Sequence, residues 1–177
     1  KGAGVQLFKS INRLEEVLNN DWNELSLDGI TLVQEYIEPK DGCIVRVEFI
    51  GGEYYYAVRV DASDGFELCP ADDCHAEDVF CPTTENVSSK KEKFEIIKNY
   101  YNPDLDKYKA FLKNSGMEIA AIEYVVNKNG EKYVYDVNVN TNYNSIAERN
   151  HRKNLNGMRQ IALFLGEELK IIQNKMT

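Results

Sequence analysis

Three polar side chains in the last third of the sequence, Glu123, Asp136 and Asn138, are suited to binding a hard metal ion. They lie on two β-rich segments separated by Asn129-Gly130, a strong signal for a two-residue type I′ turn. With that turn, Glu123 pairs with Asp136, and Asn138 lies on the same face. Facing carboxylates repel each other, and a bound Mg²⁺ would remove the repulsion. Two alternatives stay open: a solvated face on which both acids point to water, or a raised carboxylate pKa.

Two arginines earlier in the chain could bind an anion. Arg46 and Arg59 lie on either side of a Gly-Gly pair at 51–52, which also predicts a two-residue hairpin turn. With that turn both guanidinium groups are expected on one face, and arginine is well shaped to bind phosphate oxygens. The alternative is a solvated surface on which Glu48 and Glu53 pair with the arginines.

A third cluster, Cys69, Cys74, His75 and Cys81, resembles a metal-binding set only loosely. Its spacing lacks the CxxC pairs that are typical of structural zinc sites. A chain of 177 residues does not need disulfides for its stability, so reduced thiols in a loop are the simpler interpretation.

The elements that must position these residues follow from periodicity and turn signals. Helices are expected at 10–20, 90–101, 105–115 and 155–172, and strands at 30–37, 44–50, 53–60, 118–126 and 132–139. We also expect an irregular excursion at 61–89, and a capping box from Asn12 and Glu15 in the first helix. Hairpins with helices around them predict an α+β fold, with an antiparallel-rich sheet and flanking helices.

Composition narrows the functional classes. The chain has 177 residues, 43% of them hydrophobic, and a formal net charge of −8, which predicts one soluble globular domain. An acidic chain without a basic cluster argues against nucleic acid and anionic membranes as partners. It contains no run of 18 apolar residues and no secretory signal, so we expect a cytoplasmic location.

Several segments together resemble the ATP-grasp superfamily, most closely its glutamate-ligase and glutathione-synthetase branches. KGAGVQLF at 1–8 is similar to the end of its glycine-rich loop, and LVQEYI at 32–37 to its adenine hinge. IVRVEFIGGEYYYAVRV at 44–60 resembles the hairpin with its phosphate-side arginines. IAAIEYVV at 119–126 and YVYDVNVNTNYN at 133–144 resemble its two metal-binding strands.

The resemblance implies a carboxylate–amine ligase. ATP would phosphorylate a carboxylate, and an amine would attack the acyl phosphate to give an amide, with small molecules or peptides as substrates. The residues that match the family motifs would have the following roles: Glu123, Asp136 and Asn138 as Mg²⁺ ligands, Arg46 and Arg59 as catalytic cations, Gln34, Glu35 and Ile37 at the adenine, and Gly2 and Gly4 at the phosphates. The implied cofactors are ATP and Mg²⁺.

The resemblance covers only the C-terminal portion of the family's fold. It implies an N-terminally truncated domain over 1–177, with a remnant of the small nucleotide-covering subdomain at 1–40 and the catalytic sheet at 41–177. Gly42-Cys43-Ile44 replaces the family's ribose-side Gly-x-Asp, and 65–74 replaces an Arg-x-Asn loop. The nucleotide lysines would lie upstream, so the isolated chain is expected to be inactive and to bind ATP weakly or not at all.

Two other functions stay open. One is an ATP-grasp kinase that phosphorylates a hydroxyl group, and the other is a nucleotide-binding module without turnover. The oligomeric state and the identity of the acid and amine do not follow from the sequence.

Overall fold

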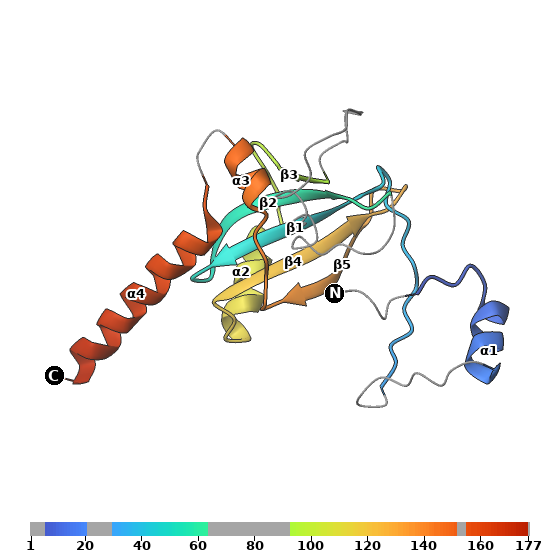
Figure 1. Ribbon diagram of the computed structural model, residues 1–177, viewed down its shortest axis with the longest axis horizontal. Helices are drawn as coiled ribbons and strands as arrows, with labels where there is room; N and C mark the ends of the chain where they lie inside the picture. Colours follow the sequence, from blue (N-terminus) through green and yellow to red (C-terminus); the bar gives the residue numbers. More distant parts are fainter. Residues whose placement is uncertain (1–5, 21–29, 64–92, 152–154, 177) are drawn as a thin grey trace, which may run out of the picture.

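One antiparallel sheet organises the chain. The computed structural model describes residues 6–20, 30–63, 93–151 and 155–176. Its elements, in chain order, are α1 (Ile11–Asn20), β1 (Cys43–Ile50), β2 (Glu53–Asp61), β3 (Phe94–Ile96), α2 (Leu105–Asn114), β4 (Ile119–Val126), β5 (Lys132–Asn138), α3 (Ser145–Asn150) and α4 (Gly157–Met176). The strand order is β3-β2-β1-β4-β5 (Figure 1). The predicted α+β class with flanking helices is confirmed.

Strand β1 is the centre of the sheet because β2 and β4 both pair with it. Side chains alternate between the two faces of a strand, so β1 contributes to two separate cores. Val47 and Phe49 point to one face, where α2 packs through Tyr108 and Leu112; we call this the α2 face. Ile44, on the other face, packs against the opposite core.

The second face carries the candidate functional residues, and we call it the site face. Its apolar cluster combines Val58 and Val60 of β2 with Phe94 and Ile96 of β3. Helix α3 contributes Ala147 to this cluster. Asn144 caps α3, because its side-chain oxygen accepts hydrogen bonds from the backbone N–H groups of residues 146 and 147 at 3.1 and 2.8 Å. The segment after β5 therefore returns across the site face.

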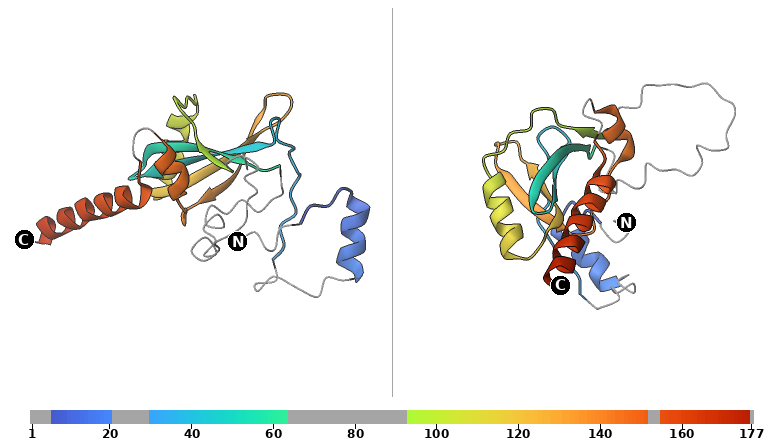
Figure 2. Two further views of the ribbon diagram at one scale, coloured as in Figure 1. Left: turned by 45° about the horizontal axis from the view of Figure 1, so that its top comes forward. Right: turned by 90° about the vertical axis from the view of Figure 1, so that its left-hand side faces the viewer.

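Helix α4 starts on the site face and then leaves the sheet. Glu148 accepts hydrogen bonds from the hydroxyl of Tyr56 at 3.0 Å and from the backbone N–H of Gly157 at 2.6 Å. A Cβ at Gly157 would lie 2.3 Å from the ring of Tyr143, so only glycine fits there. These contacts fix the start of a 20-residue helix that projects away from the sheet (Figures 1 and 2).

Two sequence predictions about elements were wrong, and one helix was missed. The predicted helix at 90–101 contains β3, because Phe94 and Ile96 pair with Val60 and Val58 of β2 and the segment adds a strand to the sheet edge. The predicted strand at 30–37 is not a strand in the structure, and Leu32 is 81% exposed there. Helix α3 was not predicted at all.

Helix α1 lies apart from the sheet (Figure 1). The capping box predicted from Asn12 and Glu15 is wrong, because Ser10 makes the cap: its hydroxyl accepts from the backbone N–H of Arg13 at 3.3 Å. The final helix begins and ends slightly later than predicted. Most of the predicted excursion at 61–89 lies outside the described residues.

Candidate functional site

The second hairpin brings the predicted metal ligands together. Glu123 of β4 pairs with Asp136 of β5, and Ala121 pairs with Asn138, as predicted. The turn is nevertheless different, because the backbone N–H of Gly130 donates to the carbonyl of Asn127 and the loop has one more residue than a type I′ turn.

A β-bulge restores the predicted register. Near the turn, Val126 pairs with Lys132 and Tyr124 with Val134, one residue out of the predicted register. The register then shifts between Glu123 and Tyr124, which leaves Tyr135 as the extra residue on β5. The two departures cancel, so the carboxylates face each other although the predicted turn was wrong.

The first hairpin contradicts the predicted two-arginine site. The Gly-Gly turn has two residues and pairs Ile50 with Glu53, as expected. Beyond it the register shifts between Glu48 and Phe49, and Tyr55 becomes the bulged residue. Arg46 then pairs with Val58 on the site face, whereas Arg59 pairs with Val45 on the α2 face. The two guanidinium groups lie on opposite faces, so the shared anion site is wrong.

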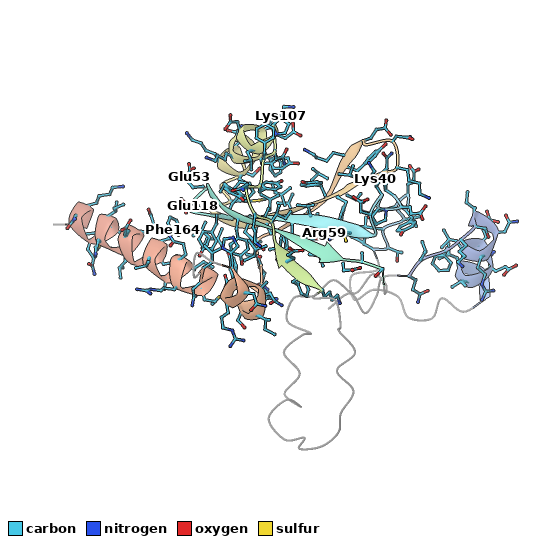
Figure 3. The ribbon with its side chains drawn as sticks, turned by 90° about the horizontal axis from the view of Figure 1, so that it is seen from above. Lys40, Glu53, Arg59, Lys107, Glu118 and Phe164 are labelled. Atoms are coloured by element: carbon cyan, nitrogen blue, oxygen red, sulfur yellow. The ribbon has the colours of Figure 1, made fainter. Side chains whose placement is uncertain are left out.

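The bulge changes the face because side chains alternate with a period of two, and one extra residue inverts every later position. Arg59 lies at the end of the sheet away from the Gly-Gly turn, whereas Glu53, Glu118 and Phe164 lie near that turn (Figure 3). Arg59 is also half-buried on the face that α2 covers.

Arg46 is the centre of a buried ion cluster on the site face. It is 4% exposed, and Glu48 and Glu123 beside it are 1% and 7% exposed. Its Nε lies 2.7 Å from Glu48 Oε1, and its Nη1 lies 3.5 Å from Glu123 Oε1. Thr141 accepts a hydrogen bond from Arg46 Nη2 and donates one to Glu48 Oε2 at 2.7 Å. The hydroxyl of Tyr135 donates to Glu123 Oε2 at 2.9 Å.

Burial dominates the electrostatics of this buried ion cluster. Desolvation raises the pKa of Glu48 to about 7, although the Arg46 charge and the Thr141 hydrogen bond oppose the shift. Desolvation also raises the pKa of Glu123; Arg46 and the Tyr135 hydrogen bond oppose this shift, and the Asp136 charge adds to it. Both glutamates therefore hold protons more tightly than exposed carboxyls do.

The formal charges of the buried ion cluster do not balance. Arg46 contributes one positive charge, and the buried Glu48 and Glu123 contribute two negative charges when ionised, while the exposed Asp136 opposite Glu123 adds a third at the edge of the cluster. A proton on Glu48, which its raised pKa favours, or a cation compensates the buried excess. The donor set fits a hard divalent cation, because Glu123 and Asp136 offer carboxylate oxygens and Asn138 an amide oxygen.

The described residues supply only part of the oxygen ligands that a divalent cation needs. Within the described residues, no three Asp, Glu, His or Cys side chains form a group that could hold a metal ion. The oxygen of Asn138 already accepts a hydrogen bond from the backbone N–H of Asn140 at 2.8 Å. Mg²⁺ is commonly bound by one or two carboxylates, with waters and substrate phosphates completing its shell, so the arrangement suits an ion that arrives with a phosphate.

The predicted adenine segment runs beside the end of the second hairpin. Ile37 packs against the site-face cluster. Glu38 forms an ion pair with Lys128 at 2.6 Å, and the backbone N–H of Lys40 donates to the carbonyl of Val126 at 2.8 Å. Gln34 and Glu35 are exposed.

Other predicted residues lie outside the described part of the chain. These are Gly2 and Gly4 at the predicted phosphate loop, and the cluster Cys69, Cys74, His75 and Cys81. The phosphate loop and the zinc alternative therefore stay untested.

The sequence did not identify three parts of the buried ion cluster. Thr141 and Tyr135 were not predicted, and Glu48 was not expected to be buried. The Arg46-x-Glu48 spacing was a usable signal, because residues two apart on a strand share a face. No local pattern identified the other two.

A pocket of about 340 Å³ lies between α3 and the start of α4. The lining residues are Tyr55, Arg149, Leu155, Asn156, Arg159, Gln160 and Leu163. The backbone donors here are already used, because residue 157 donates to Glu148 and residue 159 donates to the side chain of residue 156. We assign no ligand to this pocket. Among the described helices, none is both long and apolar enough to cross a membrane.

Among known proteins, those similar to this chain are found among solved structures. No protein-family model and no curated protein matches the chain. It is similar to the structure of a RiPP-associated ATP-grasp ligase of Chryseobacterium gregarium in complex with ADP and a leader and core peptide. The TM-score is 0.48 and the sequence identity is 16%, and the match covers 76% of this chain and 35% of the ligase.

Two macrocyclases of Microcystis aeruginosa are also similar. MdnC, bound with the precursor peptide MdnA, has a TM-score of 0.44 and 11% identity over 76% of this chain and 32% of its own. MdnB has a TM-score of 0.44 and 13% identity over 89% of this chain and 45% of its own. The chain therefore spans less than half the length of each of these three proteins.

Proposed function

We propose that the chain is the catalytic sheet of an ATP-dependent carboxylate–amine ligase that acts through an acyl phosphate. The observation that carries the proposal is the charge imbalance on the site face. Arg46 lies between Glu48 and Glu123, and Asp136 adds a further carboxylate opposite Glu123. Burying two carboxylates beside one guanidinium is costly unless a proton or a cation completes the site, so the retention of this pair next to the exposed Asp136 favours a function for it.

In this proposal Mg²⁺ is held by Glu123, Asp136 and Asn138, and it supplies electrostatic stabilisation of the phosphates. Neighbouring residues of the buried ion cluster orient Glu123. Arg46 and the hydroxyl of Tyr135 hold the two oxygens of Glu123, which fixes the direction of that carboxylate. Such fixed partners are what a preorganised site requires, because they do not have to rearrange during the reaction.

The remaining parts of the site are assigned by the sequence resemblance. Backbone groups near Gln34, Glu35 and Ile37 bind the adenine, and Gly2 and Gly4 let backbone amides approach the phosphates. Arg46 retains a catalytic role in the proposal, as positive charge behind Glu123. Arg59 is left out because it lies on the opposite face.

The proposed reaction uses two substrates besides ATP. The acid takes the γ-phosphoryl group and releases ADP; the amine then attacks the acyl carbon and releases phosphate. Positioning and electrostatics dominate such phosphoryl transfers. The acid and the amine are small molecules or peptides. The proposed division keeps 1–40 as part of the nucleotide-covering subdomain and 41–177 as the catalytic sheet.

The test uses the full-length protein with ATP, Mg²⁺ and panels of acids, amines and alcohols, and measures ADP release. Glu123→Gln and Asp136→Asn are expected to lower kcat by about 100-fold or more while the circular dichroism spectrum stays unchanged. The same variants should weaken the binding of Mn²⁺–ATP, which electron paramagnetic resonance measures without turnover.

The matched control is Glu131→Gln, an exposed carboxylate in the loop of the same hairpin. It should keep normal kcat and Mn²⁺ binding. ADP release that requires both an acid and an amine supports the ligase. Release with an alcohol alone would indicate a kinase, and nucleotide binding without release would indicate a binding module. Near-normal turnover in both variants would show that the three residues form a solvated surface.

A further inference from the structure

Helix α4 carries an exposed apolar stripe that is independent of the site face. Met158, Leu165, Leu169, Ile172 and Met176 are 65%, 53%, 55%, 53% and 82% exposed. Together with Ala162 they follow a spacing of 4, 3, 4, 3 and 4 residues. At 100° per residue, all six lie within about 40° of one line along the helix.

None of the other described residues covers this stripe, as its exposure shows. The half-buried positions Ile161, Phe164 and Glu168 lie on another side of the helix, and the ring of Phe164 there lies 3.0 Å from a Cβ built at Gly51 in the β1–β2 turn. These positions are turned by roughly 60–120° from the stripe. The helix projects beyond the sheet in Figure 1 and in the left view of Figure 2. The stripe is therefore a strict heptad seam, the pattern by which two helices pack as a coiled coil.

We propose that this seam pairs with α4 of a second copy of the chain, in antiparallel orientation. The spacing reads the same in both directions, which is what a two-fold axis through the middle of the helix requires. Pairing about that axis joins Met158 to Met176, Leu165 to Leu169, and Ala162 to Ile172. The smallest side chain meets a large one, so every layer is filled.

A parallel pair would be worse packed. It would join Ala162 to its own copy and leave a gap in one layer, and such gaps destabilise a core. The antiparallel pair also aligns the two helix dipoles favourably. One contact opposes it: Glu168 lies near its own copy at the centre, on the side of the helix that carries Phe164. The seam is less than three heptads long, so we expect a weak, concentration-dependent dimer.

The experiment is sedimentation equilibrium of the 177-residue chain over a concentration series from about 1 to 200 µM, the range in which a weak dimer dissociates. The average molar mass should rise with concentration toward twice the mass of one chain. Leu165→Glu should abolish this rise by placing a charge in the seam. The matched control is Leu163→Glu, because Leu163 is equally apolar and 54% exposed but lies about 140° away from the seam. Circular dichroism checks that both variants fold.

A charge-swap experiment tests the orientation. In the antiparallel pair, Glu at 165 of one chain meets Lys at 169 of the other, so mixing Leu165→Glu with Leu169→Lys should restore a dimer that neither variant forms alone. A parallel pair puts those charges in different layers and gives no rescue. A monomer at every concentration, equal loss with Leu163→Glu, or no rescue in the mixture would each overturn the proposal.

Discussion

The pKa of Glu48 makes the stability of this fold depend on pH in a direction opposite to that of most carboxylates. Burial raises the pKa from 4.5 to about 7 in the folded state. Between these two values the unfolded chain has lost its proton while the folded chain keeps it, so rising pH favours unfolding. The stability from this group is complete below pH 4.5 and is lost as the pH rises through about 7.

The size of the effect follows from the same two values. A difference of about 2.5 pH units at about 1.4 kcal/mol per unit gives about 3 kcal/mol. Glu48→Gln is neutral in both states and removes this contribution. Between pH 4.5 and 7.5 the free energy of unfolding of the wild type should therefore fall by about 3 kcal/mol more than that of the variant.

Urea unfolding at a series of pH values, followed by circular dichroism, measures both curves. Glu53→Gln is the control, because Glu53 is an exposed carboxylate on the same hairpin. It should keep the pH dependence of the wild type. If Glu48→Gln instead shows the wild-type curve, Glu48 is not the group that resists ionisation, and the account of the buried ion cluster fails.

Three further predictions concern contacts on the site face and at the β1–β2 turn, and the same unfolding assay tests them. Thr141→Val should cost about 1–3 kcal/mol at pH 8 and should raise the pKa of Glu48 further, because it removes a hydrogen bond to that carboxylate. Gly51→Ala should lower the free energy of unfolding more than Gly52→Ala. Both glycines have positive φ angles, but only a Cβ at Gly51 would lie 3.0 Å from the ring of Phe164 in α4. Equal losses of stability would show that the contact between Gly51 and Phe164 is unimportant. Asn144→Ala should cost about 1 kcal/mol, and Asn144→Ser should recover most of it.

The first hairpin turn was easier to predict than the strand that follows it, whereas the Asn129-Gly130 turn was wrong. The Gly-Gly turn was correct because glycine tolerates the positive φ angles of 64° and 73° found there. The bulges at Tyr55 and Tyr135 were missed because tyrosine has high strand propensity and neither position carries a glycine or another bulge signal. A bulge depends on how two strands fit together, so one strand's sequence does not reveal it.

Tertiary pairing also explains the misassigned elements. Residues 94–96 become a strand only because β2 presents an edge to them, and Val58 and Val60 are their partners. Residues 30–37 include strand-forming types, but the structure has no strand there, and Leu32 is 81% exposed. Propensity was overridden in both cases.

The candidate site was predictable by residue type and not by burial. Glu123 and Asp136 were identified because facing acids need an explanation. Glu48 entered only the alternative interpretation, as part of a solvated surface, since strand alternation does not show which face a later segment will cover. Thr141 belongs to that later segment, and its crossing over the site face is what removes Glu48 from water.

The position of β5 at the edge of the described sheet gives the two halves of the candidate site different local stabilities. Glu123 lies on a strand with neighbours on both sides, so its backbone amides exchange with solvent only when much of the sheet opens. Asp136 and Asn138 lie on a strand held from one side, which can open without the rest. A ligand that bridges both strands would therefore slow hydrogen exchange in β5 and leave β4 nearly unchanged, and part of its binding energy would be spent on holding the edge closed.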